Sequence, residues 1–357
     1  MNYKCFVKNG INVLEEYFFR KSFFKNQCNT YNLSSDKVKK AKRLGFTADE
    51  FVIYDLEHNN PNDYISEFER LRFRNAVANY RILLDNKIVF YNIIKNFADT
   101  NKIYAYKEKK QYISLEHNFE KSEILIRLQE LGKIVYKKMN AGGGEGFKLL
   151  EYYNNNYFIN HKKSSENDIK AILNKDNYLL EEYCVQSEFE NTIWPYSVNT
   201  IRIITLLNDE NIVIPVAAFQ RVGIDKSKCV DNACAGGMHS KINISTGELT
   251  FARSHAADKL FDKEGNKLLF NKHPKTGTVI KGMKIPNWET VLKQVVDLHK
   301  KLLFTGIFFI AWDIALTNHG IKIIEANTSC SMDLLQTFEG MRNNYIGKWM
   351  KNNGYIK

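Results

Sequence analysis

The chain has 357 residues, of which 44% are hydrophobic and 25% charged, the proportions of an ordinary soluble globular protein with room for two domains. Its 51 basic and 40 acidic residues leave a formal charge of +11, which could suit nucleic acid, an anionic membrane surface or phosphorylated ligands. No recognition module accompanies the charge. We therefore expect a Lys- and Asn-rich surface, nucleotide phosphates as the main anionic partner, and no nucleic acid.

The longest apolar stretch, Leu302 to Trp312, is too short to span a bilayer, so no transmembrane segment is expected. The start MNYKCFVKNG has no apolar segment behind a basic start, which favours a cytoplasmic location. The six cysteines are irregularly spaced without metal-ligand pairing, and reduced thiols are expected.

Residues 1–80 are predicted to form a helical N-terminal region. Val13 to Phe24 and Asp36 to Leu44 favour helices, the second with an N-cap at Ser34 to Asp36. After a turn at Pro61 to Asp63, a long amphipathic run extends from Tyr64 to Phe97, interrupted at Asp85 to Lys87. The amphipathic helices could serve as a partner-binding face and support a homodimer.

Short strands and helices alternate from residue 100 to 185. Leu125 to Leu131 is predicted to be a helix, and Ile134 to Lys138 and Tyr178 to Tyr183 are predicted strands. From Val185 onward the pattern is mostly that of strands, among them Val198 to Leu207 and Ile212 to Val222. Residues 287 to 303 favour an amphipathic helix.

The stretch from Ile307 to Leu335 predicts a hairpin of two buried strands. Its first strand carries Asp313, and its second ends in Glu325-Ala326-Asn327. A carboxylate within an apolar strand is costly unless a partner offsets the cost. Because the hairpin brings Asp313, Glu325 and Asn327 together, we expect a hard-cation site, most naturally Mg²⁺ against nucleotide phosphates. A capped hairpin with acids at its ends by chance is the alternative.

A predicted strand delivers Lys137 into a loop that contains Gly142, Gly143, Gly144 and Gly146. Without Cβ atoms such a loop can bring backbone N–H groups against phosphate oxygens, and the lysine supplies the opposite charge. The spacing is not that of a Walker loop. Phosphate binding is favoured over a flexible hairpin.

The strand that ends in Glu181-Glu182-Tyr183-Cys184 and precedes Glu188 could line an adenosine pocket, with Glu188 at the ribose. A strand end held by salt bridges is the simpler interpretation. Further along, Arg202, Arg221 and Lys241 each lie beside a predicted strand. Buried arginines need an anion, and near a metal–triphosphate site they would stabilise a transferring phosphoryl group.

Taken together, these features resemble the ATP-grasp superfamily, and most closely its sugar-transfer-associated branch from bacterial polysaccharide genes. The resemblance covers roughly residues 78 to 340. It rests on the order and spacing of ten short segments: Asp85-Asn86-Lys87, Lys137 to Gly146, Leu180 to Tyr183, Ser197 to Arg202, Val230 to Asn232 with Gly236-Gly237, His273-Pro274 with Ile285 to Trp288, Trp312 to Ala315, and Ile324 to Asn327.

The resemblance implies an α+β, ATP-grasp fold, in which two α+β subdomains grip ATP between them, together with a helical N-terminal segment. The expected ATP-grasp domain is 81–357, with a lid subdomain at about 105–184 and a catalytic subdomain at about 185–357. Lys87 and Lys137 would contact the α- and β-phosphates, with the glycine loop as a lid. Residues 181 to 184 would line the adenine pocket. Asp313, Glu325 and Asn327 would hold two Mg²⁺ ions, with Mn²⁺ as a substitute.

The chemistry implied is carboxylate activation to an acyl phosphate, which an amine then attacks to give an amide, ADP and phosphate. The expected substrates are small carboxylates and amines, an amino acid and a sugar or glycan precursor. A kinase and a non-catalytic nucleotide-binding partner of a glycosyltransferase are the alternatives.

This chain departs from the pattern in two places. Peptide-forming relatives carry an arginine where this chain has Ala311, so Arg202 or Arg221 is expected to take that role. The usual N-terminal Rossmann-like domain is replaced by residues 1 to 80.

Overall fold

The computed structural model describes residues 18–25, 27–115, 119, 123–262, 265 and 267–356. Residues 18–25 are helical, and 13–17 of the predicted first helix lie outside the described residues. Chain contacts divide the described residues into two compact units, one made of the described residues up to Ala76 together with 331–356, and the other made of those from Val77 to Cys330. The sequence placed this boundary a few residues later, at residue 80, and it did not predict that the C-terminal residues belong to the first unit.

The first unit is helical. Its elements are α2 (Ser35–Leu44), α3 (Ala48–Ile53), η1 (Pro61–Asp63), α4 (Glu67–Ala76), α11 (Met332–Gln336) and α12 (Tyr345–Asn352). Gln336 of α11 accepts a hydrogen bond from Ile65 N–H and donates one to the Ile65 carbonyl, each 2.7 Å long. This buried pair explains why the C-terminal residues fold with the N-terminal ones.

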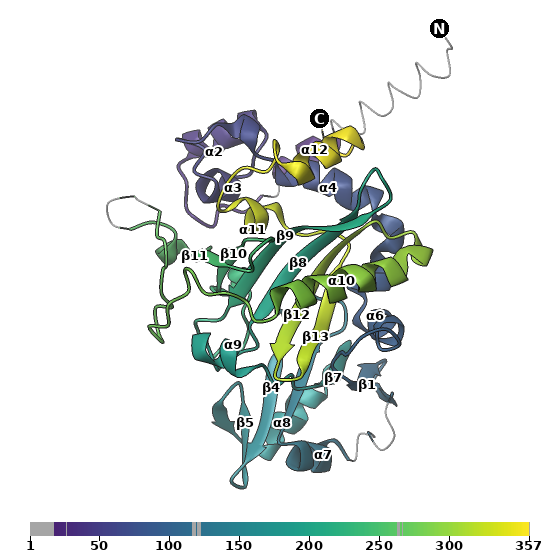
Figure 1. The fold of residues 1–357 in the computed structure, drawn as a ribbon. Helices are drawn as coiled ribbons and strands as arrows, with labels where there is room; N and C mark the ends of the chain where they lie inside the picture. Colours follow the sequence, from purple (N-terminus) through teal and green to yellow (C-terminus); the bar gives the residue numbers. More distant parts are fainter. Residues whose placement is uncertain are drawn as a thin grey trace. The chain divides into compact units, whose positions relative to one another are not determined.

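The second unit contains two antiparallel sheets (Figure 1). The seven-stranded sheet has the order β2-β1-β7-β3-β4-β5-β6, with α7 and α8 packed against it. The bounds are β1 (Ile103–Glu108), β2 (Gln111–Ser114), β3 (Lys133–Lys138), β4 (Lys148–Tyr153), β5 (Asn156–Ile159), β6 (Lys162–Ser164), β7 (Tyr178–Glu182), α7 (Ile124–Leu131) and α8 (Glu166–Leu173).

The six-stranded sheet has the order β11-β10-β9-β8-β12-β13, and α10 crosses one of its faces (Figure 1). Its strands and the helices of this part are β8 (Thr200–Leu207), β9 (Val213–Val222), β10 (Met238–Ile242), β11 (Leu249–Ser254), β12 (Phe309–Thr317), β13 (Gly320–Asn327), α9 (Glu188–Ile193), η3 (Ala233–Ala235), η4 (Ala257–Lys259), α10 (Trp288–Leu302) and η5 (Leu303–Thr305).

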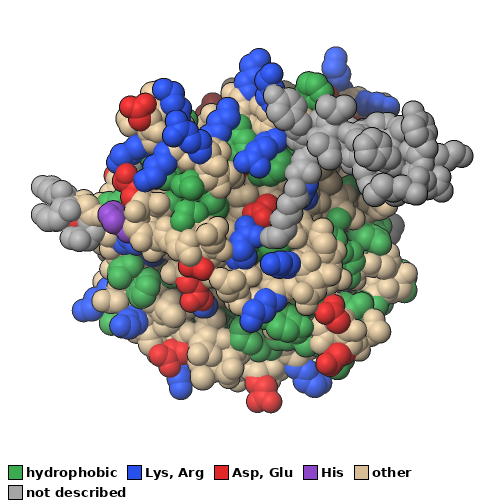
Figure 2. Space-filling view, turned by 90° about the horizontal axis from the view of Figure 1, so that it is seen from above, with side chains coloured by type: hydrophobic (Ala, Val, Ile, Leu, Met, Phe, Trp, Pro, Cys, Tyr) green, Lys and Arg blue, Asp and Glu red, His purple; other side chains and the backbone are tan. Residues whose placement is uncertain are grey.

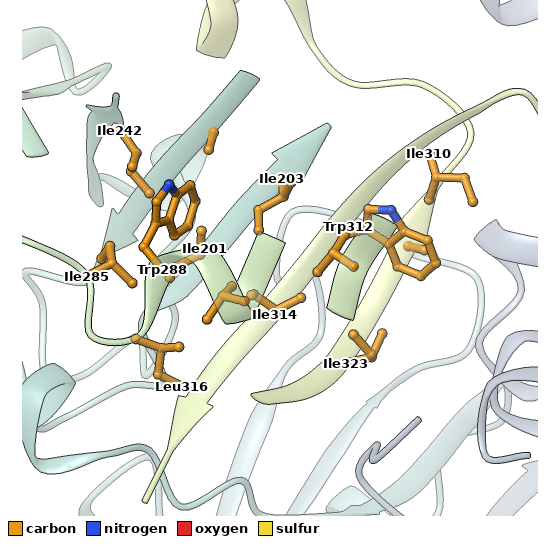
Figure 3. Close-up of a cluster of buried hydrophobic side chains, with 14 of the residues drawn as sticks. Ile201, Ile203, Ile242, Ile285, Trp288, Ile310, Trp312, Ile314, Leu316 and Ile323 are labelled. Carbon is orange, nitrogen blue, oxygen red and sulfur yellow. The ribbon is translucent and has the colours of Figure 1, made fainter. Parts of the chain in front are cut away.

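Alternation along these strands separates an apolar face from a polar one. Ile201 and Ile203 of β8 pack with Trp312 and Ile314 of β12 and with Trp288 of α10 (Figure 3). The residues between them, such as Arg202 and Asp313, therefore point to the opposite face. The core under α10 thus fixes which side chains are presented for chemistry.

The predicted run from Tyr64 to Phe97 is not continuous. It is divided into α4, η2 (Ala78–Tyr80), α5 (Arg81–Asp85) and α6 (Lys87–Ile94). Asn86 begins α6 because its side chain accepts hydrogen bonds from Ile88 N–H and Val89 N–H at 3.0 and 3.1 Å. The cap therefore sets the break before Lys87, whereas the periodicity alone did not reveal the break at η2.

Among the residues that the structure describes, none of the helices combines the length and the apolar character that crossing a membrane would need. On the face drawn in Figure 2, Lys and Arg side chains are spread among polar and apolar atoms.

A buried histidine links α10 to the sheet. The Trp312 indole donates to Thr205 Oγ1 at 2.8 Å, Thr205 lies 2.7 Å from His299 Nδ1, and His299 Nε2 lies 3.2 Å from the Ile307 carbonyl. Nε2–H is then the donor to the carbonyl, and Nδ1 accepts from the hydroxyl. Burial lowers the pKa of His299 to about 4, against the opposing effect of the Ile307 hydrogen bond.

This lowered pKa predicts a loss of stability in acid. The unfolded chain takes up a proton at this site below about pH 6.5, whereas the folded chain resists it until about pH 4. We expect His299 to account for a fall of about 3 kcal/mol in unfolding free energy between those pH values. Urea denaturation at several pH values should show that the unfolding free energy falls more steeply with decreasing pH in the wild type than in His299→Gln. His319→Gln is the control, because His319 is exposed. An equal dependence of the unfolding free energy on pH in all three proteins would contradict this assignment.

Candidate active site

The β12–β13 hairpin carries a carboxylate on each strand. Asp313 lies opposite Glu325 in the ladder, and Ala311 lies opposite Asn327. A bulge follows Asp313, since the next pair joins Ile314 to Ile323 and leaves Ile324 as the extra residue. Such a bulge re-aims the side chains next to it. Ile324 and Glu325 accordingly both line the same cavity as Asp313.

Two arginines, one on β8 and one on β9, hold Asp313. Arg202 of β8 bonds both carboxylate oxygens, the longer contact being 2.8 Å, and Arg221 of β9 reaches Oδ2 at 3.0 Å. Burial alone would raise the pKa of Asp313, but the two guanidinium groups outweigh it and hold the pKa well below its usual range. Asp313 therefore stays ionised although its side chain is fully buried.

Glu325 lies in contact with Asp313 and is affected in the opposite direction. Burial, followed by the charge of Asp313, raises the pKa of Glu325 above its usual range. Two carboxyl groups in contact need a proton or a cation between them. With the Asn327 carboxamide two residues further along β13, the donor set is one that suits Mg²⁺. Within the described residues there is no group of three or more His, Cys, Asp or Glu side chains that could hold a metal ion.

Two lysines flank this carboxylate pair. Lys87, at the start of α6, lies 4.0 Å from Glu325 and donates to the Ala141 carbonyl at 2.5 Å. Lys137 of β3 is paired with Glu181 of β7 at 2.6 Å. Burial lowers the pKa of Lys87, and the nearby Lys137 lowers it further against the opposing charge of Glu325. These ammonium groups are available to an incoming anion that can displace their present partners.

The glycine-rich loop connects β3 to β4 and lines the same cavity with Gly142, Gly143 and Gly144. Gly144 has φ +75°, and a Cβ there would lie 3.1 Å from Val230. Gly146 has φ +73°, and a Cβ there would lie 2.6 Å from the Tyr178 hydroxyl. At both positions a side chain would be strained in the backbone and crowded, so the loop requires glycine.

The cavity has an apolar part beside this charged one. Val135 and Leu149 pack with Cys229, and Phe147 and Tyr183 cover them. Glu182 is the last residue of β7 that pairs with β3, so Tyr183 and Cys184 lie beyond the ladder. All of these except Glu182 line the cavity. An apolar slot next to lysines, arginine and carboxylates fits a base joined to a chain of phosphates.

The sequence profile described as sugar-transfer associated ATP-grasp matches residues 67–345. The chain belongs to this family. Its two antiparallel sheets with their helices are the mixed α+β, ATP-grasp fold, and the helical N-terminal residues accompany it.

No curated protein matches the chain. Solved structures that resemble this ATP-grasp chain include the D-alanine–D-alanine ligase of Coxiella burnetii, at 8% identity and TM-score 0.34 over 69% of this chain and 48% of that one. Another is the ADP-complexed N5-carboxyaminoimidazole synthetase of Staphylococcus aureus, at 10% identity and TM-score 0.37 over 70% and 46%. A third is the D-alanine–D-alanine ligase of Helicobacter pylori, at 15% identity and TM-score 0.38 over 76% and 60%.

The matched region spans about half the length of the first solved chains, 46–53%. These identities and TM-scores are too low for any activity of those proteins to be transferred to this ATP-grasp chain.

The structure brings most of the predicted site residues into one cavity. Those that line it are Lys87, Lys137, Gly142, Gly143, Gly144, Glu181, Tyr183, Cys184, Arg221, Asp313 and Glu325. Arg202 and Asn327 lie on the same face of the sheet as Asp313, with Arg202 paired to Asp313 and Asn327 paired to Ala311. Lys241 lies on β10, paired with Phe219 of β9, and does not line the cavity.

Three predicted nucleotide contacts lie outside the cavity lining. Gly146 is at the base of the loop against Tyr178. Glu182 is paired with Lys322 at 2.7 Å. Glu188 is exposed in the first turn of α9, and its N–H donates to the Asn318 side chain. For Glu181 and Glu182 the structure shows the salt-bridged strand end that the sequence left open as the simpler interpretation.

The sequence analysis gave no role to Asp231, which is also a buried carboxylate. Asp231 accepts hydrogen bonds from Thr200 N–H and Oγ1 at 2.9 and 2.5 Å and lies 3.5 Å from Arg221. Arg221 also donates to Thr200 Oγ1. Asp231 and Thr200 therefore position Arg221 at the cavity. The only signal was that both occur in segments, Val230 to Asn232 and Ser197 to Arg202, that carried the family resemblance.

Proposed function

We propose that the chain is an ATP-dependent carboxylate–amine ligase that works through an acyl phosphate. The observation that supports this most directly is one cavity that combines an apolar slot with Lys87, Lys137 and Arg221 and with the Asp313–Glu325 pair. The slot would take the adenine, and the cations would neutralise the phosphates. The family name supports a sugar or glycan precursor as one substrate and an amino acid as the other.

The roles follow from the positions of the side chains. Lys87 and Lys137 would exchange their present partners for phosphate oxygens, and the glycine loop would close over the triphosphate. Asp313, Glu325 and Asn327 would hold Mg²⁺, which when bound neutralises charge on the transferring phosphoryl group. Arg221 lines the cavity, whereas Arg202, which holds Asp313 from the adjacent strand, does not. Arg221 is therefore the better candidate to stabilise the acyl phosphate, the role that Ala311 cannot supply.

The decisive experiment is a coupled ADP-release screen that crosses amino acids with amino sugars and uronic acid sugars. A ligase should release ADP only when a carboxylate and an amine are both present. Stable phosphorylation of one hydroxyl substrate alone would instead support the alternative, a kinase. Binding of Mg²⁺–ATP without turnover across the panel would favour a non-catalytic partner of a glycosyltransferase and would contradict the ligase proposal.

A lysine substitution tests the nucleotide part separately. Lys137→Met should weaken MgADP binding at least about tenfold, because a charge-assisted contact to phosphate contributes on the order of 1.5–3 kcal/mol. Lys133→Met is the matched control, since Lys133 lies on the same strand but does not line this cavity. Calorimetry measures both, with circular dichroism to confirm folding. Equal affinities of the two variants for MgADP would show that Lys137 does not contact the nucleotide.

A further inference from the structure

The excess positive charge of the chain is concentrated in one short segment of the helical unit. Residues 18 to 45 contain eight Lys and Arg residues and a single acidic one, a surplus of seven, whereas the whole chain has a surplus of eleven. The eight side chains are all exposed, and we call them the basic face: Arg20, Lys21, Lys25, Lys37, Lys39, Lys40, Lys42 and Arg43. Nothing in the proposed ligase reaction uses this charge.

Little of this charge is neutralised within the protein. Lys37 is paired with Glu57 at 2.9 Å, and Lys39 lies 3.5 Å from Asp36. Both pairs are exposed to solvent, where an ion pair contributes little. The other six cations have no acidic partner among the residues that the structure describes. The basic face is therefore available to an anionic partner outside the chain.

Aromatic packing joins the helical residues 18–25 to α2. The Phe24 ring lies 6.0 Å from the ring of Phe68 on α4. The Arg20 guanidinium and the Lys42 ammonium lie 5.5 and 6.0 Å from the centre of that same Phe24 ring. Arg20 also borders one cavity together with Leu44, the last residue of α2. The two basic stretches therefore meet at Phe24 and form one surface.

Exposed apolar side chains lie among these cations. Phe18 is 62% exposed and Leu44 is 40% exposed. Phe18, Lys21 and Lys25 are three and four residues apart in a helical segment, so they share one face of it. On a helix that lies at a bilayer, Lys and Arg meet the headgroups while aromatic and aliphatic side chains enter the boundary with the acyl chains. The basic face has both kinds of side chain.

We propose that the basic face binds the surface of a bilayer that contains anionic lipids. The negative potential of such a surface attracts each nearby Lys or Arg, and clusters of about four to eight of them are typical of proteins held there. A membrane fits better than a nucleic acid because Phe18 and Leu44 are presented with the charge, and because the chain has no nucleic-acid recognition module. This binding does not depend on the ligase reaction.

Co-sedimentation of the full chain with lipid vesicles tests the role of charge. We expect binding to vesicles of two parts phosphatidylcholine to one part phosphatidylglycerol, weakening as salt is added, and little binding to phosphatidylcholine alone. The double variant Lys42→Glu/Arg43→Glu should bind the anionic vesicles at least about tenfold more weakly. Lys162→Glu/Lys163→Glu is the matched control, because it makes the same charge change at exposed lysines of β6 and should bind like the wild type.

A fluorescent residue tests contact with the lipid itself. Phe18→Trp should show a blue shift in emission with the anionic vesicles and quenching when their acyl chains carry bromine. Phe304→Trp is the control, because Phe304 is 76% exposed on η5, outside the basic face. Its added emission should change little. Circular dichroism establishes that all four variants are folded.

Three results would overturn the proposal. The first is equal binding to the neutral and the anionic vesicles. The second is an equal loss in the two charge-reversal variants, because net charge alone would then explain the binding. The third is an oligonucleotide that binds more tightly than the vesicles and is lost with Lys42→Glu/Arg43→Glu, which would assign the basic face to nucleic acid. Equal emission changes at positions 18 and 304 would likewise exclude a specific contact of Phe18 with lipid.

Discussion

Glu325→Gln is expected to lower ATP turnover by about 10²–10³-fold, the range observed when one group that stabilises transition-state charge is removed. The amide keeps the shape of the side chain and can still hydrogen-bond to Asp313, so the fold should be unchanged. It cannot supply the second negative charge that a Mg²⁺ ion beside Asp313 requires. The measurement is ADP release by the purified variants in the presence of excess Mg²⁺.

The matched control is Glu182→Gln. Glu182 belongs to β7, next to Glu181, but is paired with Lys322 outside the cavity. It should lose little turnover. Circular dichroism and the unfolding midpoint establish that both proteins are folded. Near-normal turnover of Glu325→Gln would show that Glu325 is not a metal ligand. Equal losses of turnover in both variants would indicate a general effect of removing a carboxylate.

The carboxylate hairpin could be predicted because its signals are local. Asp313 interrupts an apolar run, the turn residues at Thr317 to Gly320 separate two strands, and antiparallel pairing of the strands places Glu325 near Asp313. The glycine loop after β3 is equally local, and so is α10 with its apolar periodicity. Each of these depends on residues close in sequence, which is what a single sequence can reveal.

The arginine contacts depend instead on the order of strands. Arg202 meets Asp313 because β8 pairs with β12, and Arg221 meets it because β9 adjoins β8. Nothing within a single strand determines that order. Glu188, which the sequence analysis expected at the ribose, lies exposed in the first turn of α9, because that helix begins at this residue. Non-local pairing and local helix capping therefore account for what the sequence could not supply.

Asp313→Asn should produce the largest loss of stability of any single substitution in the site. The amide leaves the buried Arg202 and Arg221 without their shared anion, and breaking a buried ion pair by removing one partner costs about 3–5 kcal/mol. Arg202 is the more affected, because both of its contacts to Asp313 are lost, while Arg221 keeps Thr200 and Asp231. Urea denaturation measures the change. Asp297→Asn on α10 is the control. The lysine partners of Asp297 are exposed, so this substitution should cause no detectable loss of unfolding free energy.

A double-mutant cycle separates the ion pair from a general effect on the hairpin. Arg202→Met removes the guanidinium that Asp313→Asn would leave unpaired, so the double variant should be more stable than the sum of the two single losses predicts. The coupling should exceed about 1 kcal/mol, since residues in one buried network usually couple by 0.5–3 kcal/mol. Additive losses would mean that Arg202 and Asp313 act independently. Strong coupling with turnover still abolished in the double variant would show that Asp313 has a second task besides neutralising the arginine.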